Sequence, residues 1–127
     1  MGKYLMDNNA ISHFFSGTYT ESGLDFISNI IDDIPNISVI TQIEALSWIQ
    51  ADKKKERIIA EFIADAHVFI LTNEIVEKCI AIRRSKKIKT PDAIIAATAI
   101  EHNLTLVSSD KGFDNIKDLV VIDPNSF

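Results

Sequence analysis

Residues 90–107 read TPDAIIAATAIEHNLTLV, and this stretch decides the fold class. Thr90 is predicted to be the N-cap of a helix with Pro91 at its first position, because the fixed φ of proline suits helix entry. Apolar residues at helical spacing follow over 93–100, and the short aliphatic run 104–107 then predicts a buried strand. A helix that leads directly into a buried strand is the repeating unit of an α/β fold.

The same unit recurs along the chain. Other short apolar runs predict strands, and the longer segments between them have helical spacing. The predicted strands are 4–6, 37–40, 68–71, 104–107 and 119–122, and the predicted helices are 23–31, 43–49, 57–64, 75–84 and 93–100. Because parallel strands need crossover helices, we expect a mostly parallel sheet of four to five strands with helices on both faces. Without repeats or linkers, residues 1–127 are predicted to form a single α/β domain.

Composition narrows the class of protein further. The 127 residues carry 13 Lys and Arg against 18 Asp and Glu, and the net charge of −5 argues against nucleic-acid binding by bulk charge. The one cysteine, Cys79, excludes an internal disulfide, and its apolar helical context predicts a small buried hydrophobe. The longest apolar stretch, 93–100, is too short to cross a bilayer, and the N-terminus has no signal-peptide pattern. We expect a soluble, cytoplasmic protein.

Acidic residues follow the predicted strands at the edge where their carboxyl ends meet. Asp7 directly follows the first strand, and Asp110 lies just past the fourth. Glu44 is on the helix predicted to open at Thr41, and Asp92 is in the first turn of the helix that leads into the fourth strand. Because open parallel sheets bind ligands at this edge, we expect the four carboxylates to converge.

Converging carboxylates imply a cation, because they raise one another's pKa values unless a cation neutralises them. The chain has three His and one Cys, none at zinc-ligand spacing, so oxygen ligands and hence Mg²⁺ or Mn²⁺ are favoured. Mg²⁺ keeps several waters and binds through a few carboxylates and substrate phosphates. The pattern therefore suits phosphodiester hydrolysis by metal-activated water, without a side-chain nucleophile.

Four segments of the chain resemble the motifs of one family, in the family's order. They are Asp7-Asn8-Asn9 after the first strand, ISVITQIE at 37–44, TPDAIIAATA at 90–99 and LTLVSSDKGF at 104–113. The chain therefore resembles the PIN-domain ribonucleases, most closely the toxin of VapBC-type toxin–antitoxin pairs. By position, the resemblance places the family's metal-binding and catalytic acids on Asp7, Glu44, Asp92 and Asp110, and its supporting polar residues on Asn9 and Ser108.

The resemblance implies an activity and a set of partners. It implies a Mg²⁺- or Mn²⁺-dependent endoribonuclease that is the toxin of a type II toxin–antitoxin module, with RNA as substrate. It also implies a cognate antitoxin and a homodimer, and we expect the antitoxin groove near Phe14, Phe15 and Phe26. The chain departs from the family pattern at Gly112, where many members have an acid, and Asp114 is then the candidate support for a second metal ion.

Each acid also has a structural interpretation. Asp7 and Asp92 can stabilise the start of a helix, and Asp110 lies in a stretch of turn composition. Thr41 and Glu44 have the spacing of a capping box, in which the Glu side chain reaches back to the N-cap amide. Structural and functional roles therefore compete at all four positions.

A basic run lies directly before Asp92. Its cations are Arg83, Arg84, Lys86, Lys87 and Lys89. Such a run is usually a solvated helix end, where the helix dipole favours positive charge. Beside an acidic site it also suits contact with RNA phosphates or with an antitoxin.

Two other functions compete with the nuclease. A non-catalytic binding module of the same fold would lack acids for productive metal binding, and Gly112 keeps this alternative open. A Mg²⁺-dependent phosphatase would use Asp7 as its nucleophile. That chemistry would need a second Asp at position 9 as acid and base, and the residue there is Asn9.

Overall fold

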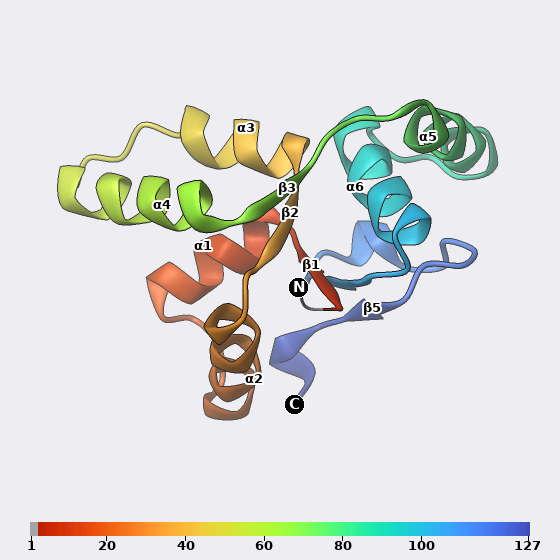
Figure 1. The fold of residues 1–127 in the computed structure, drawn as a ribbon. Helices are drawn as coiled ribbons and strands as arrows, with labels where there is room; N and C mark the ends of the chain where they lie inside the picture. Colours follow the sequence, from red (N-terminus) through yellow and green to blue (C-terminus); the bar gives the residue numbers. More distant parts are fainter. Residues whose placement is uncertain (1–2) are drawn as a thin grey trace.

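The computed structural model describes residues 3–127 and contains a five-stranded sheet (Figure 1). Every neighbouring pair of strands is parallel, in the order β3-β2-β1-β4-β5. The strands are β1 (Tyr4–Met6), β2 (Asn36–Ser38), β3 (His67–Phe69), β4 (Thr105–Val107) and β5 (Val121–Ile122). The predicted α/β class with a parallel central sheet is confirmed.

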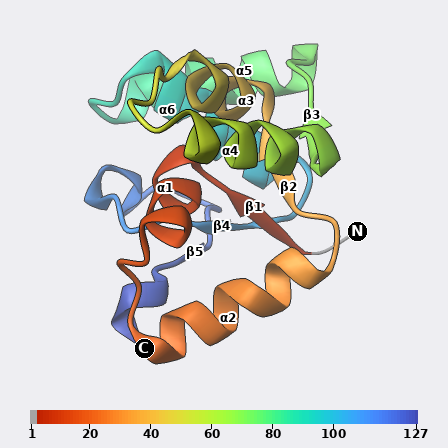
Figure 2. The ribbon, with the colours of Figure 1, turned by 90° about the vertical axis from the view of Figure 1, so that its left-hand side faces the viewer.

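Helices cover both faces of this sheet. One side has α1 (Asn8–Ser16), α2 (Glu21–Asp32), α3 (Val39–Ser47) and α4 (Lys53–Asp65), and the other has α5 (Asn73–Ser85) and α6 (Thr90–Glu101) (Figures 1 and 2). Two short 3₁₀ turns follow, η1 (Lys111–Phe113) and η2 (Pro124–Ser126). No helix within residues 3–127 has both the length and the apolar character needed to cross a membrane.

Alternate residues of the central strands supply two separate cores, because successive side chains of a strand point to opposite faces. Leu5 and Leu106 pack on the side of α5 and α6, whereas the next residues, Met6 and Val107, pack on the side of α1–α4. All four are completely buried. Each buried apolar side chain of this size contributes about 1.5–3 kcal/mol, so the two cores fix the register of β1 against β4.

The strand order creates a switch point between β1 and β4. From β1 the chain steps outward to β2 and β3, and then returns to β4 and β5 on the opposite side. In open α/β sheets, ligands bind at the carboxyl ends of the strands at such a point. Met6 and Val107 are the last residues of these two strands and are paired with each other. Residues directly after them therefore enter the same crevice.

Helix α3 begins earlier than the sequence predicts. Strand β2 ends at Ser38, whose hydroxyl oxygen accepts a hydrogen bond from the Ile40 backbone N at 3.1 Å and so caps α3. The β-branched run had favoured a strand as far as Ile40, but the cap turns the chain into a helix. Thr41 is buried inside this helix and is not its N-cap, so the capping-box interpretation of Glu44 is wrong.

Two other helix starts differ from the prediction. The N-cap of α6 is Lys89, with Thr90 as the first helical residue and Pro91 as the second, and the Ala93 backbone N reaches the Lys89 carbonyl at 2.9 Å. Proline is tolerated there because amides of the first helical turn have no intrahelical acceptor. Helix α1 lies outside the predicted ranges, because the Asp-Asn-Asn stretch at its start has turn composition.

Helix α5 contains the single cysteine of the chain. Cys79 is buried in the core that α5 shares with α6, and burial raises the pKa of its thiol. A buried thiol with a raised pKa is unreactive. The structure therefore agrees with the prediction that Cys79 is a small buried hydrophobe.

Substitution of Gly23 tests the contact between α2 and the C-terminal turn. Thr20 caps α2 by accepting a hydrogen bond from the Gly23 backbone N at 3.0 Å, and a Cβ on Gly23 would overlap the Pro124 carbonyl oxygen. Gly23→Ala should lower the free energy of unfolding by about 1–3 kcal/mol, because η2 must move. Urea unfolding measures this, with the exposed neighbour Ser22→Ala as control. Equal stability of the two variants would contradict the prediction.

Candidate active site

The Asp7 carboxylate accepts hydrogen bonds from two different segments of the chain. Asp7 follows β1 directly and is only 4% exposed. Its Oδ1 accepts a hydrogen bond from the Ala10 backbone N at 2.7 Å, which caps α1, and its carboxylate also accepts one from the Ser108 hydroxyl. Asp7 therefore starts α1 and is linked to the segment after β4.

Ser108 connects Asp7 to Asp110. The buried Ser108 Oγ accepts a hydrogen bond from the Asp110 backbone N at 3.0 Å, while its hydroxyl donates to Asp7. The Asp110 Oδ1 in turn accepts from the Gly112 backbone N at 2.8 Å, which caps η1. These bonds hold both carboxylates at the carboxyl ends of β1 and β4.

The four predicted acids line one small polar cleft. Glu44 enters from α3, Asp92 from the first turn of α6, and Asp7 and Asp110 from the ends of the two central strands. The cleft has a volume of about 90 Å³ and is lined by Asp7, Asn8, Asn9, Glu44, Asp92, Ile95 and Asp110. Acids that lie up to 103 residues apart in the sequence, from Asp7 to Asp110, thus meet at one place.

The pKa values of three of these acids reflect their burial and their mutual repulsion. Burial is the main reason that the pKa of Asp7 is raised from 3.8 to about 6, and the charges of Asp110 and Asp92 add to this. Burial also raises the pKa of Asp92, with a further contribution from Asp110, and that of Glu44, with a contribution from Asp92. The cleft therefore concentrates negative charge that a cation would neutralise.

The other predicted site residues differ in their positions. Asn9 lines the cleft, as does its neighbour Asn8, which the sequence reasoning did not single out although it adjoins Asp7. Ser108 lies behind the cleft wall, where it holds Asp7 and Asp110. Asp114 is exposed beyond η1 and does not line the cleft. The structure therefore does not place Asp114 where it could support a second ion.

The cations of the basic run differ in their contacts with the rest of the described chain. Arg83 Nε donates to the Ile88 carbonyl at 3.2 Å, and Lys86 Nζ donates to the Asp114 carbonyl. Both therefore help to fasten the connection between α5 and α6. Arg84 and Lys87 are exposed. These two have the geometry expected of cations available to a ligand.

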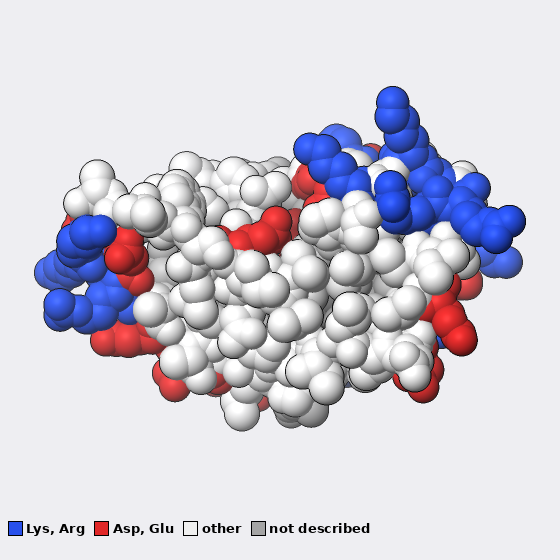
Figure 3. Space-filling view, turned by 90° about the horizontal axis from the view of Figure 1, so that it is seen from above, with Lys and Arg blue, Asp and Glu red and all other residues white. Residues whose placement is uncertain are grey.

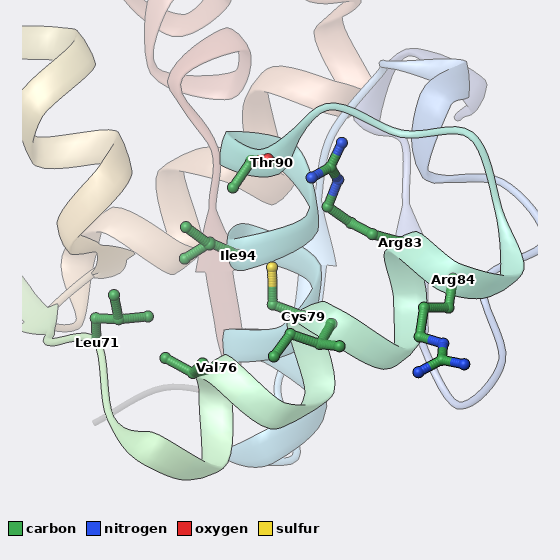
Figure 4. Close-up of a pocket in the computed structure, with 8 residues that line it drawn as sticks. Leu71, Val76, Cys79, Arg83, Arg84, Thr90 and Ile94 are labelled. Carbon is green, nitrogen blue, oxygen red and sulfur yellow. The ribbon is translucent and has the colours of Figure 1, made fainter.

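A larger cavity of about 580 Å³ lies between α5 and α6 (Figure 4). Its lining is mostly apolar and includes Leu71, Val76, Cys79, Ile80 and Ile94, with Arg83, Arg84 and Thr90 at its border. Figure 4 shows Arg83 directed toward the start of α6 and Arg84 directed away from it. None of the four acids lines this cavity, so its size does not make it the catalytic site.

The donor set of the polar cleft suits a hard divalent cation. Its polar lining residues all have side-chain oxygens, the ligands that Mg²⁺ and Mn²⁺ prefer. Within residues 3–127, no group of three Asp, Glu, His or Cys side chains is positioned to hold a metal ion by itself. Mg²⁺ needs only one or two direct carboxylates and retains its waters. The cleft exceeds the 10–15 Å³ or so that one water needs, so the residues fit a partly hydrated ion.

The profile of the PIN domain family matches residues 4–119, a span that contains all four acids and four complete strands of the sheet. The chain belongs to the PIN domain family. No curated protein matches this PIN-domain chain closely enough to count as a relative.

Solved structures share the fold over almost the whole chain. A toxin–antitoxin complex from Klebsiella pneumoniae matches with 28% identity and a TM-score of 0.74, over 95% of this chain and 97% of that chain. FitAcB from Neisseria gonorrhoeae matches with 25% identity and a TM-score of 0.72, over 95% and 97%. DNA-bound VapBC from Salmonella typhimurium, at 19% identity, has a TM-score of 0.80 over 98% and 99%, and shows the fold alone.

The raised pKa of Asp7 predicts a pH dependence of stability in EDTA. Because the folded state binds this proton more tightly than the unfolded state, its contribution is present at low pH and is lost as pH rises through about 6. Between about pH 4.5 and about pH 7.5 the parent should lose about 2 kcal/mol relative to Asp7→Asn. The asparagine keeps the helix cap, because Asn is as good an N-cap as Asp.

Urea unfolding across this pH range, with Asp25→Asn on the exposed face of α2 as the matched control, measures the effect. The Asp25→Asn variant should follow the parent at every pH. A stability difference between parent and Asp7→Asn that stays constant with pH would mean that Asp7 is not destabilised by its burial.

Proposed function

We propose that this PIN-domain protein is a Mg²⁺- or Mn²⁺-dependent endoribonuclease and the toxin of a type II toxin–antitoxin module. The observation that carries the proposal is that Asp7, Glu44, Asp92 and Asp110 line one oxygen-rich cleft at the switch point of the sheet. The likeness to a toxin–antitoxin complex at 28% identity supports the toxin assignment.

In the proposed reaction, the residues of the chain bind and orient. Backbone amides and Ser108 hold the carboxylates of Asp7 and Asp110 at the cleft wall, so that little reorganisation is needed when substrate enters. Glu44 and Asp92 complete the cleft from two different helices. A bound Mg²⁺ or Mn²⁺ would supply an activated water and would neutralise the negative charge of the cleft and the phosphate.

The alternatives fit the cleft less well. The phosphatase would need an acid two residues after Asp7, and the Asn9 side chain at that place is a neutral amide that cannot exchange a proton as an acid does. A binding module without catalysis has one observation in its favour, because Gly112 offers no carboxylate directly before Phe113. The four acids at the cleft favour the nuclease.

The three phenylalanines near which the sequence predicts an antitoxin groove are only partly exposed. Phe14, Phe15 and Phe26 are half-buried and pack against the core beneath α1–α4. Their rings contact other rings edge to face, including Phe62 for Phe15 and Tyr4 for Phe26. These side chains serve the fold, so we propose that a cognate antitoxin binds the chain elsewhere.

Loss of one cleft acid tests the nuclease directly. Asp92→Asn should reduce cleavage of a pool of structured RNAs at least about 100-fold in Mg²⁺ or Mn²⁺, because metal-assisted stabilisation of the transition state is worth several kcal/mol. Asp114→Asn, an exposed acid outside the cleft, should cleave at the parent's rate. Gel analysis of labelled RNA with and without EDTA measures both.

A thermal-shift measurement separates loss of metal from loss of folding. Mg²⁺ should raise the melting temperature of the parent more than that of Asp92→Asn, by mass action on the folded state. Cleavage that continues in EDTA, or an Asp92→Asn variant as active as the parent, would refute the metal-dependent mechanism.

We also propose that the chain forms a homodimer through the apolar surface around the α5–α6 cavity. Ile70 and Leu71 follow the edge strand β3 and are 68% and 48% exposed, and Ile80 on α5 is 54% exposed. Leu71 and Ile80 also line the cavity, and exposed apolar side chains around a cavity are typical of protein interfaces. Strand β3 is at the edge of the sheet, where another chain can pair with it.

Light scattering during gel filtration tests the dimer. The parent should have a mass of about 28 kDa, twice the 14.2 kDa of the chain. Ile80→Glu should reduce this to one chain, because the dimer would bury the new charge, whereas Ile58→Glu on the exposed side of α4 should not. A monomeric parent would contradict the proposal.

A further inference from the structure

A second basic cluster lies at the start of α4, far along the chain from the run before Asp92. Lys53, Lys54, Lys55 and Arg57 fall within five positions, and all but the half-buried Lys55 are exposed. We call these four residues the α4 cluster. Together with the five cations of residues 83–89, it accounts for 9 of the 13 Lys and Arg in a chain of net charge −5. The positive charge is therefore segregated into two places.

Helix stability does not explain the α4 cluster. Arg83 and Arg84 are in the last turn of α5, where the helix dipole favours cations, but the three lysines occupy the first turn of α4, where it disfavours them. Asp52 accepts hydrogen bonds from the Lys54 and Lys55 backbone amides and offsets part of this cost.

Within residues 3–127, the α4 cluster makes one ion pair, and that pair is weak. Lys53 Nζ lies 3.5 Å from Glu56 Oε2, with side chains that are 70% and 40% exposed, and pairs of this kind contribute little. Neither the helix dipole nor this ion pair therefore explains why these cations lie together.

Both basic clusters lie on the face that holds the acids. Figure 3, seen from above the strand ends, shows Lys and Arg gathered at two opposite ends, with acidic side chains between them. Helix α3 contributes Glu44 to the cleft, and the connection that follows α3 leads to Lys53 at the start of α4. The order along this face is cations, acids, cations, which fits an extended polyanion whose middle lies over the acidic cleft.

An exposed aromatic residue lies between Glu44 of the cleft and the α4 cluster in the sequence. Trp48 ends α3 and is 48% exposed. The connection that follows it is held against the first turns of α4, because the Gln50 backbone N donates to Glu56 Oε2 at 2.7 Å. An aromatic ring beside cations can stack a base while the cations bind phosphates. This combination favours nucleic acid over an acidic protein segment.

We propose that single-stranded RNA crosses this face from the run at 83–89, over the acidic cleft, to the α4 cluster, and that Trp48 stacks a base on that path. This rests on the proposed function, because it assigns the polyanion to the substrate of that same cleft. The α4 cluster then holds the RNA strand on one side of the scissile bond and the run at 83–89 holds it on the other. Phosphate contacts of this kind add affinity without reading sequence.

Trp48 is the only tryptophan of the chain, so its fluorescence reports on this path directly. The probe is a 30-nucleotide single-stranded RNA of mixed sequence with a 5′ fluorescent label, in EDTA so that no cleavage occurs. Binding is followed by anisotropy of the label and, with unlabelled RNA of the same sequence, by quenching of Trp48. The test variant is Lys54→Gln/Arg57→Gln, and the matched control is Lys3→Gln/Lys117→Gln, which changes the net charge equally at other exposed sites.

The test variant should bind about 3- to 10-fold more weakly than the parent, and its log–log salt slope should be smaller by about 1.4, or about 0.7 per lost phosphate contact. RNA should quench Trp48 in the parent, and the control should match the parent in affinity. The melting temperature of the test variant should be unchanged or higher, because Lys54 opposes the helix dipole. A purely structural role for the cluster would instead lower it.

Several outcomes would overturn this proposal. One is an RNA affinity equal in the test variant and the parent, and another is anisotropy that rises on binding while Trp48 fluorescence stays constant. If polyglutamate displaces the probe as well as unlabelled RNA of equal charge does, the surface binds polyanions in general and the assignment to RNA fails. A parent that cleaves RNA in Mg²⁺ while the test variant binds normally would leave the nuclease intact and refute only this path.

Discussion

The burial of one carboxylate, Asp7, is the constraint on which the rest of the structure depends. Removing an ionised group from water is costly, so this position requires partners for its oxygens. The Ala10 amide and the Ser108 hydroxyl supply them, one from α1 and the other from the segment after β4. The same side chain therefore starts a helix, ties together the ends of the two central strands and lines the cleft. Asp7 therefore contributes to the fold and to the candidate site at the same time.

The net charge of the chain does not show how its acidic and basic residues are distributed around Asp7. The cleft places several acids close enough to raise one another's pKa values, while nine of the cations lie in two separate clusters. The two clusters can thus attract a polyanion to an acidic chain, and a divalent cation would neutralise the cleft between them. The net charge of −5 argues only against binding by bulk charge, because binding responds to local potential rather than to the sum over the chain.

The sequence located the four acids of the cleft but not the starts of the helices that present them. Asp7 and Asp110 were recognisable because each follows a short apolar run, and the motif order indicated Glu44 and Asp92. The strand predicted through Ile40 was too long, because β-branched residues favour strands locally while the Ser38 cap requires the next residues to be helical. The position of Asp114 was also beyond prediction, since a short 3₁₀ turn decides whether that side chain faces the cleft.

By itself, the sequence determined the α/β class, the parallel sheet, the burial of Cys79 and the residue types of the candidate site, because apolar periodicity and motif spacing are local properties. Only the tertiary structure decided the strand order, and with it the switch point between β1 and β4 that brings Asp7 beside Asp110. It also decided that Phe14, Phe15 and Phe26 pack inward, and that the α4 cluster shares a face with the cleft. Such features depend on contacts between distant segments, which the pattern of any one segment does not contain.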